Sequence, residues 1–438
     1  MDTLHKAAPC FLPARILLPA PGTPLNPWAC IAVDQFTSQP DYWRRAEALA
    51  AGRASTLHIV LPEAYLGQPG EEQRLDRIRR TMADYRKHLL TRVVDGFVYV
   101  ERTQADGSVR QGLVGAVDLE AYSYAPGDHP AIRPSENTVV ERIPPRLKVR
   151  RGAELETPHV MLLADDEACT LIEPVAAVKN RLPLLYDGEL MLGGGHLRGW
   201  AVEDPDLIAG IEAAVTALGD PAAFAARWPG AAGQPPMTLA VGDGNHSLAT
   251  AKAYWEERKA VLPPDKQQTD PARYCLVEVC NVHAPAIEIE PIHRVLFGTR
   301  AAQVRAALEA WATANTICVS PGSSQQFTLV SADGEEALGF AGEVEPLTVG
   351  TVERFVQDFL RHNPGVRVDY IHGEAAVRSL AAAGGVGLVM PPLEKADLFR
   401  GVVLGGVLPR KTFSMGHAEE KRYYNECRSL VDNATPSV

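Results

Sequence analysis

Hydrophobic and polar positions along this chain follow two periods, which predict a mixture of helices and strands. Apolar residues at helical spacing predict helices that begin near residue 41 and cover residues 74–90, 205–229, 245–259 and 301–314. Short apolar runs predict strands over residues 56–61, 159–163, 237–241 and 273–281. Residues 96–100 and 111–117 flank an Asp-Gly turn at hairpin spacing. The pattern predicts an α/β fold class of mixed α+β character.

The character of the chain also changes twice along its length. Residues 125–155 are rich in proline and arginine, and near residue 300 a new helix begins, followed by two strands and a charged terminal helix. A chain of 438 residues is too long for one ordinary core. We therefore predict three domains: an N-terminal α/β portion over 1–124, a core over 125–299, and a C-terminal α+β portion over 300–438.

Composition and charge limit the classes of molecule that this protein could bind. The formal net charge is -11, which argues against broad binding to nucleic acid, because neutralising phosphates needs a basic surface. A local basic pocket for one small phosphorylated ligand remains compatible with this charge. The N-terminal apolar stretch is interrupted by Pro13, Arg15 and Pro19, and no run approaches the roughly 18 apolar residues of a membrane span. The seven cysteines are scattered and form no Cys-x-x-Cys pair. We expect a cytoplasmic protein that acts on a small molecule, without nucleic acid or membrane, with a homo-oligomer left open.

The strongest local signal is a strand that enters a two-glycine turn and continues into a helix. The turn and the first helical turn contain Gly242, Asp243, Gly244, Asn245, His246 and Ser247. Backbone N–H groups and the positive end of the helix dipole make such a junction a natural anion site, and glycine lets a phosphate approach the backbone. Asp243 is placed to hold a divalent cation, and His246 and Ser247 are donors. The alternative is an ordinary capped helix, with Asp243 or Asn245 as the N-cap.

Two further segments carry candidate residues. In the segment over 133–138, Glu136 can act as a general base on a hydroxyl and Arg133 can clamp a phosphate or carboxylate. The alternative is a solvated loop with a surface ion pair. In the segment over 410–414, Lys411 and Thr412 can contact a transferred phosphate, and the alternative there is the solvated end of the final helix.

Other chemistries find less support in the sequence. His283, Glu288, Glu290 and His293 fit no familiar zinc spacing, and alternation along a strand would divide them between faces. The sequence contains neither a Walker loop nor the Gly-x-Ser-x-Gly elbow of a Ser-His-Asp hydrolase. We therefore expect neither a zinc site nor a hydrolase triad.

Five motifs in this order resemble the family called domain of unknown function 1015. They lie at residues 133–138, 145–148, 243–247, 291–294 and 408–412. Residues 32–36 and 61–63 fit the family as well, so the resemblance spans nearly the whole chain. Five ordered motifs are far more specific than any one of them.

The family's central Asp-Gly-His-His-Arg motif is similar to that of ParB-like proteins that act as free serine kinases. The resemblance implies a ParB-like catalytic core with smaller flanking α+β portions, in which the strand-turn-helix holds the phosphate donor. It implies that Glu136 is the base that activates the hydroxyl. It also implies that the phosphate and metal site is lined by Asp243, Gly244, Asn245 and His246. Arg133 and Lys411 are further candidates for this site.

This chain departs from the family motif at two positions. Asn245 replaces the first histidine and Ser247 replaces the arginine, whereas His246 is retained. Losing the arginine removes a planar cation that would contact phosphate. These departures leave two alternatives open: the phosphate donor differs from that of the family, or the activity is lost.

These observations predict a small-molecule phosphotransferase. We expect it to move a phosphoryl group, with Mg²⁺, from ATP, ADP or pyrophosphate to a hydroxyl, with free L-serine as the best single acceptor. The main alternative is a nucleotide-binding or nucleotide-hydrolysing regulatory switch without a small-molecule acceptor. A DNA-binding protein of the wider ParB-like group is a third reading, which the acidic balance opposes.

Overall fold

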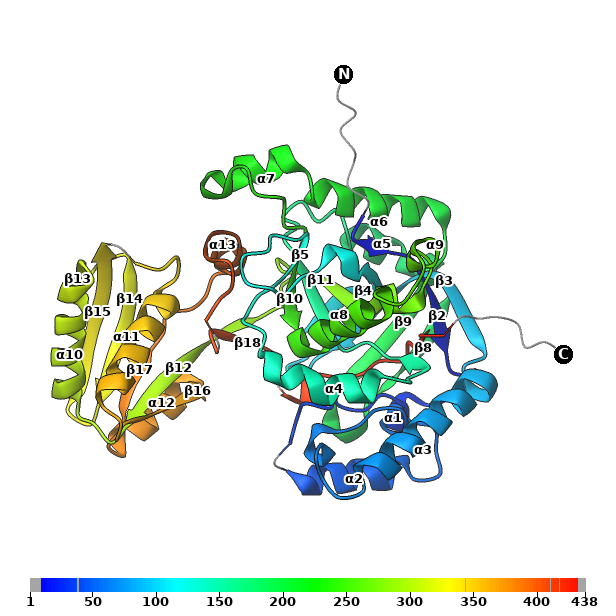
Figure 1. Cartoon of the computed structure of the whole chain (residues 1–438), viewed down its shortest axis with the longest axis horizontal. Coiled ribbons are helices and arrows are strands. Elements are labelled where there is room, and N and C mark those ends of the chain that lie inside the picture. The colour runs from blue at the N-terminus through cyan, green and yellow to red at the C-terminus, as the bar shows by residue number, and fades with distance from the viewer. Residues whose placement is uncertain (1–8, 38, 343, 410, 417, 432–438) are drawn as a thin grey trace. The chain divides into compact units, whose positions relative to one another are not determined.

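The computed structural model describes residues 9–431 apart from residues 38, 343, 410 and 417, and the described chain divides into two compact units (Figure 1). We call the first unit the residues up to Pro134, Thr138–Ile287 and the residues from Gly416 onward. The second unit consists of Ser135–Asn137 and Glu288–Met415. Sheets and helices are mixed in both units, so the predicted α/β class is confirmed. Arg410 of the predicted basic stretch lies outside the described residues.

The first unit is built on a ten-stranded sheet in the order β5-β10-β7-β11-β4-β3-β9-β8, with β1 paired to β4 and β2 to β3. Its strands are β1 Phe11–Leu12, β2 Ala14–Leu18, β3 Arg92–Thr103, β4 Val109–Asp118, β5 Ile132–Pro134, β7 Met161–Ala164, β8 Leu184–Glu189, β9 His196–Val202, β10 Leu239–Asp243 and β11 Tyr274–Asn281. A small separate pair joins β6 Leu155–Glu156 to β19 Arg428–Ser429. Its helices are α1 Leu25–Trp28, α2 Pro40–Ala50, α3 Glu71–Asp84, α4 Ile143–Arg150, α5 Glu173–Val178, α6 Pro205–Leu218, α7 Pro221–Arg227, α8 Asn245–Lys259 and α9 Pro264–Gln267.

Both faces of this sheet are buried, and the sequence of β3 shows why. Phe97 and Tyr99 point to one apolar cluster, whereas Val98 and Val100 point to another. Successive side chains of a strand face opposite sides, so a continuous apolar run needs cover on both. On the first face, Leu248, Ala251 and Trp255 of α8 supply part of that cover. Figure 1 shows α8 in front of the sheet.

The second unit contains a seven-stranded sheet in the order β13-β15-β14-β17-β12-β16, with β18 paired to β12. Its strands are β12 Ile289–Phe297, β13 Ile317–Val319, β14 Gln325–Ser331, β15 Gly334–Gly342, β16 Arg367–His372, β17 Val386–Val389 and β18 Phe413–Met415. Its helices are α10 Ala301–Ala314, α11 Thr348–His362, α12 Glu374–Ala382 and α13 Lys395–Gly405. Val377 of α12 packs with Val295 and Val330 of the sheet, and Phe355 of α11 packs on Trp311 of α10.

The units differ from the three predicted segments. Strands β3 and β4, from the first predicted segment, lie in the same sheet as β10 and β11 from the second. The residues from Gly416 onward return to the first unit. Hydrogen bonds between strands far apart in sequence therefore override the local changes of composition on which the three segments were based.

Most predicted elements are confirmed, including α8 and α10 with their full bounds, but two predictions are wrong. The predicted strand over 56–61 is a 3-10 turn, Thr56–His58, because the Ser55 hydroxyl accepts a hydrogen bond from the Leu57 N–H and donates one to the Pro27 carbonyl. The predicted charged terminal helix is also absent from the described residues 419–431, where a short 3-10 turn is followed by extended chain and β19. There the side chains of Tyr424 and Cys427 enter the core.

A membrane-spanning helix needs a long and almost uncharged apolar stretch. Among the described helices, none is long and apolar enough on its own, and the bent pair of α6 and α7 reaches those limits only when the two are taken together.

Candidate functional site

The site begins where β10 ends. Leu239, Ala240 and Val241 are fully buried, because β10 lies between β5 and β7. On β7, Leu162 pairs with Val241 but Met161 pairs with Asp243, so Gly242 is an extra residue, a β-bulge. A bulge re-aims the side chains that follow it, which here is the carboxylate of Asp243.

Gly244 makes the turn from β10 into α8. Its φ is +79°, a left-handed conformation that glycine adopts without a steric penalty. A Cβ on Gly244 would also lie 2.9 Å from the Cα of Val160, closer than real Cβ atoms come. Glycine is thus required twice, and its close approach to Val160 places the neighbouring His159 beside the first turn of α8.

The first turn of α8 keeps a positive electrostatic end. Its N-cap is Gly244, which has no side chain to accept a backbone hydrogen bond, and the turn contains no acidic residue. The Gly244 carbonyl accepts hydrogen bonds from the N–H groups of Ser247 and Leu248. The dipole of this 15-residue helix therefore favours an anion at its start.

Asp243 has a basic partner that the sequence analysis missed. Lys421 Nζ lies 3.4 Å from Asp243 Oδ1. The lysine is fixed by its backbone, since its carbonyl accepts a 2.7 Å hydrogen bond from the Ala32 N–H and the next-but-one residue, Tyr423, donates to the Cys30 carbonyl. Its proximity could not be predicted from spacing, because 178 residues separate it from Asp243.

His159 is the second group that the sequence analysis missed. Its Nε2 lies 2.9 Å from Ser247 Oγ, and its ring packs edge-on against Tyr423 with 4.7 Å between centroids. Burial is the largest cause that lowers the pKa of His159, so the ring is neutral near pH 7. The charges of four nearby groups also act on this pKa: Asp34 and Asp243 raise it, and Arg146 and Lys421 lower it.

A cavity of about 150 Å³ opens beside this histidine and serine. Its wall is mostly apolar, with side chains such as Ile59, Leu61 and Met82. Polar and charged residues also line it: Glu63, Arg146, Arg150, Glu156, Thr157, His159, Ser247 and Thr250. An apolar pocket with a few convergent polar groups is the usual form of a small-molecule site.

Glu63 and Arg146 form an ion pair in the wall of this cavity. Burial is the largest cause that raises the pKa of Glu63, and the guanidinium of Arg146 opposes it. Both residues belong to motifs that carried the family resemblance, although neither was predicted as a site residue.

The other predicted residues of the junction face the loop that precedes α4. The side-chain amide of Asn245 donates to Thr138 Oγ1 at 3.1 Å. The Val139 N–H donates to His246 Nε2 at 3.2 Å, which assigns the proton of a neutral ring to Nδ1. These two side chains therefore fasten residues 138–139 to the start of α8.

Arg133 has contacts that indicate a structural role, and its role as a phosphate clamp stays a prediction. It is buried on β5, and its guanidinium donates to the carbonyls of Pro130, at 3.1 Å, and Pro235, at 2.6 Å. Desolvation lowers its pKa to about 10. Its Nε and Nη2 are directed at backbone carbonyls, whereas its Nη1 has no hydrogen-bond partner among the described residues.

Glu136, Lys411 and Thr412 belong to the second unit. The backbone of Glu136 forms a bridge with Leu408, and the Glu136 charge raises the pKa of Arg294, which burial lowers overall. Lys411 is exposed, whereas Thr412 is buried and donates to the Pro409 carbonyl.

The histidines and glutamates that were considered for a metal are divided between the units. His283, in the first unit, lies 2.7 Å from Asp165, and Glu167 is the third member of this group. Arg227 pairs with both carboxylates, at 2.9 and 2.7 Å. We read the group as an ion-pair network.

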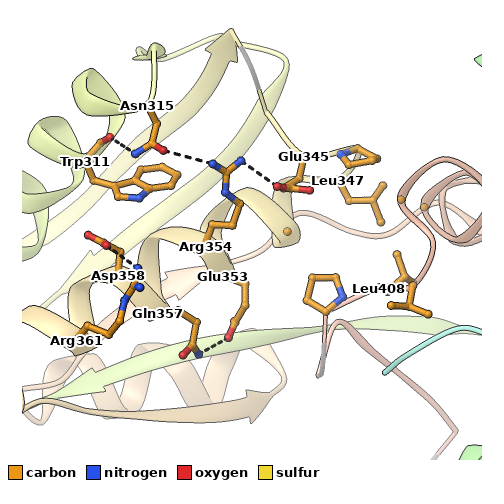
Figure 2. Close-up of a pocket in the computed structure, with 16 residues that line it drawn as sticks. Trp311, Asn315, Glu345, Leu347, Glu353, Arg354, Gln357, Asp358, Arg361 and Leu408 are labelled. Atoms are coloured by element: carbon orange, nitrogen blue, oxygen red, sulfur yellow. Dashed lines mark hydrogen bonds and ion pairs between the residues drawn. The ribbon is translucent and has the colours of Figure 1, made fainter. Parts of the chain in front are cut away.

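A larger cavity, of about 660 Å³, lies within the second unit (Figure 2). Figure 2 shows Arg354 reaching between Asn315 and Glu345, and Arg361 paired with Asp358. Both arginines are paired with acidic side chains, and Glu353 adds a third carboxylate to the lining.

Comparison with known proteins places the chain as follows. A family model described as "Protein of unknown function (DUF1015)" matches residues 13–358. Comparison with curated proteins gives no match. Among solved structures, a free serine kinase variant in complex with AMP is 10% identical with a TM-score of 0.37, covering 71% of this chain and 88% of that one. A conserved hypothetical protein from Pyrococcus furiosus is 9% identical (TM-score 0.34; 72% and 93% covered), and SbnI with a C-terminal truncation from Staphylococcus aureus is 11% identical (TM-score 0.36; 71% and 85% covered). Likenesses at these scores carry no argument about function.

Proposed function

The chain belongs to the DUF1015 family, whose members are described as proteins of unknown function, and from the site itself we propose that it is a phosphotransferase. The proposed reaction moves a phosphoryl group from ATP, ADP or pyrophosphate to the hydroxyl of a small molecule. The observation that carries the proposal is the start of α8, where a left-handed Gly244 precedes an acid-free first turn beside Asp243 and Lys421. The helix dipole and the lysine both favour a phosphate there.

Lys421 supplies a positive charge in place of the arginine that the family motif has and this chain lacks. Ser247 stands at the arginine's place, so α8 supplies no guanidinium in its first turn. Lys421 brings a cation to Asp243 from the distant end of the chain instead. A lysine binds phosphate as a point charge rather than as a bidentate fork.

Mg²⁺ fits this site as an ion carried by the donor. Asp243 offers one carboxylate, and the group of three possible ligands found among the described residues lies elsewhere, at Asp165, Glu167 and His283. Mg²⁺ is commonly held by one or two carboxylates together with substrate phosphates. Bound in this way, Mg²⁺ would neutralise charge on the donor phosphates.

The cavity beside Ser247 suits a small acceptor. Its volume of about 150 Å³ is below the ~300–1,000 Å³ of typical drug-sized ligand sites. Free L-serine remains the best single candidate. The role of Glu136 as the base stays a prediction from the motif. The cytoplasmic location and the contacts of Lys411 and Thr412 with phosphate also stay predictions, and a homo-oligomer stays open.

A transfer screen tests this function. The purified chain is incubated with Mg²⁺ and each of ATP, ADP and pyrophosphate, against serine and related hydroxy compounds, and phosphorylated product is measured. We expect one donor to be consumed in step with one acceptor. Tight nucleotide binding without consumption by any acceptor would favour the regulatory switch and contradict the transferase.

Two variants assign the roles within that assay. Glu136→Gln is expected to keep donor affinity and to lose roughly 100-fold or more in turnover, as when a general base is removed. Asp243→Asn is expected to weaken the Mg²⁺-dependent binding of the donor as well. Unchanged turnover in the Glu136 variant would remove that residue from the mechanism.

A further inference from the structure

The hydroxyl of Ser247 has the geometry of a nucleophile paired with a base. Ser247 is the third residue of α8, and its Oγ lies 2.9 Å from His159 Nε2. A serine hydroxyl is a weak nucleophile unless an adjacent base takes its proton. A neutral imidazole with its proton on Nδ1 presents a lone pair at Nε2 for this purpose.

The pair is also accessible to a small molecule. Both side chains line the 150 Å³ cavity, so the hydrogen bond between them is at the wall of a pocket and not in sealed packing. The ring of His159 also packs edge-on against Tyr423, which restricts the orientation of the imidazole.

The charges around the pair suit a phosphate on the serine. Arg146 lines the same cavity, and both Arg146 and Lys421 act electrostatically on His159. Ser247 lies in the first turn of α8, where the helix dipole stabilises a negative group. A phosphoryl group on Ser247 would therefore lie at the positive end of a helix. Two ion-paired cations act on the neighbouring histidine: Arg146, which is paired with Glu63, and Lys421, which is paired with Asp243.

We propose that Ser247 is itself a phosphoryl acceptor, so that the protein phosphorylates its own serine with His159 as the base. Ser247 Oγ attacks the terminal phosphorus of the donor, and a new O–P bond forms. The bond between that phosphorus and the bridging oxygen breaks, and ADP, AMP or orthophosphate leaves with the electron pair, according to the donor. The Ser247 proton moves to His159 Nε2. This inference rests on the proposed donor site at the start of α8.

The experiment follows a labelled terminal phosphoryl group. The full chain is incubated with Mg²⁺ and labelled ATP, ADP or pyrophosphate, without any small-molecule acceptor. Intact mass then detects one added phosphoryl group, and peptide mass spectrometry locates it. We expect a single label on Ser247 that survives acid, as a phosphoserine does and a phosphohistidine does not.

Four variants separate the chemistry from folding. Ser247→Ala should lose the label, and Ser247→Thr should regain some of it on the new hydroxyl. His159→Gln, which can still hydrogen-bond Ser247 but cannot take its proton, should label roughly 100-fold more slowly or worse. Thr216→Ala removes a helical hydroxyl on α6 that bonds only the Glu212 carbonyl in its own helix, and it should label like the parent chain. Circular dichroism on every variant confirms the fold.

Small-molecule transfer is measured in parallel, so that the two proposals fail separately. A label on Ser247 without any phosphorylated small molecule would support self-phosphorylation and contradict the transferase. Small-molecule transfer with no label on Ser247 would overturn self-phosphorylation and leave the transferase standing. If neither the label nor small-molecule transfer is seen, both proposals are overturned. A label that persists in Ser247→Ala would overturn the self-phosphorylation of Ser247 alone.

Discussion

Glu426 shows how strongly single residues of this chain depend on their surroundings. It is fully buried, and the Tyr186 hydroxyl donates to its Oε1 at 2.6 Å while the Asn425 N–H donates to Oε2. Desolvation is the largest cause that raises its pKa, to about 7, and nearby Glu278 raises it too. The native protein therefore holds this carboxyl protonated under mildly acidic conditions.

This shift predicts a loss of stability with rising pH. The pKa is raised above its ordinary value of 4.5, so the stabilisation is complete below about pH 4.5 and is lost as the pH rises through 7. The loss is on the order of 3 kcal/mol, at about 1.4 kcal/mol for each pKa unit. Glu426→Gln, which stays neutral, should gain stability over the parent chain between pH 5 and pH 8, measured by urea unfolding. An identical pH slope in both proteins would contradict this account.

Single residues also show how much of the site could be predicted from the sequence. Asp243 and Gly244 were predicted correctly as parts of a turn between strand and helix, because the signals for that turn are adjacent in sequence. Lys421 and His159 were missed, because each reaches the turn from a distant segment. The two hydrogen bonds from Arg133 to backbone carbonyls were not foreseen either, because a sequence gives no sign of them.

At the scale of elements, the β10 to α8 junction is the feature on which the site depends. The bounds of α8 followed from its glycine start and its apolar positions, which are local signals. The predicted strand over 56–61 failed because the hydroxyl of Ser55 forms hydrogen bonds that compete with a sheet ladder. The helix predicted for the charged end of the chain was wrong for residues 419–431. A charged run predicts a solvated helix, whereas here Arg428 and Glu156 pair in the interior.

Gly244→Ala tests the junction. The new Cβ would meet Val160 at 2.9 Å and the residue would have to hold a φ of +79°, so we expect a loss of about 2–4 kcal/mol, from backbone strain plus a steric clash. Gly127→Ala is the matched control, with a φ of +86° and open space around its Cβ, and should lose only the strain of about 1 kcal/mol or slightly more. Urea midpoints measure both. Equal losses would show that contact with Val160 does not constrain the turn.

At the scale of the whole molecule, the first unit is assembled from both ends of the chain. Tyr424, Cys427 and Leu430 enter its core, and the Tyr424 hydroxyl donates to Glu278 while contacting Arg110. The Leu17 carbonyl accepts a hydrogen bond from the Cys427 N–H, and the Leu17 N–H donates one to the Cys427 carbonyl. Such pairings across the chain cannot be read from composition, which is why three consecutive segments were predicted.

A pair of truncations tests this assembly. A chain that ends after Met415 loses three buried side chains worth roughly 1.5–3 kcal/mol each, a loss comparable to the ~5–15 kcal/mol that holds a typical domain together. We expect its first unit not to fold, as seen by near-ultraviolet circular dichroism and proteolysis. A chain that ends after Val431 keeps these contacts and should fold by the same two measurements. Normal folding of the shorter chain would contradict the role given to this segment.

Calorimetric titration of the parent chain with Mg²⁺ and each of ATP, ADP and pyrophosphate tests most directly whether a phosphate donor binds at the start of α8. We expect one donor to bind at one site per chain, and Lys421→Met to weaken its Kd by at least about tenfold, or ~1.4 kcal/mol. Lys266→Met, on the exposed surface of α9, should bind like the parent chain. Equal affinity in the Lys421 variant, or no binding of any donor to the parent chain, would contradict the account.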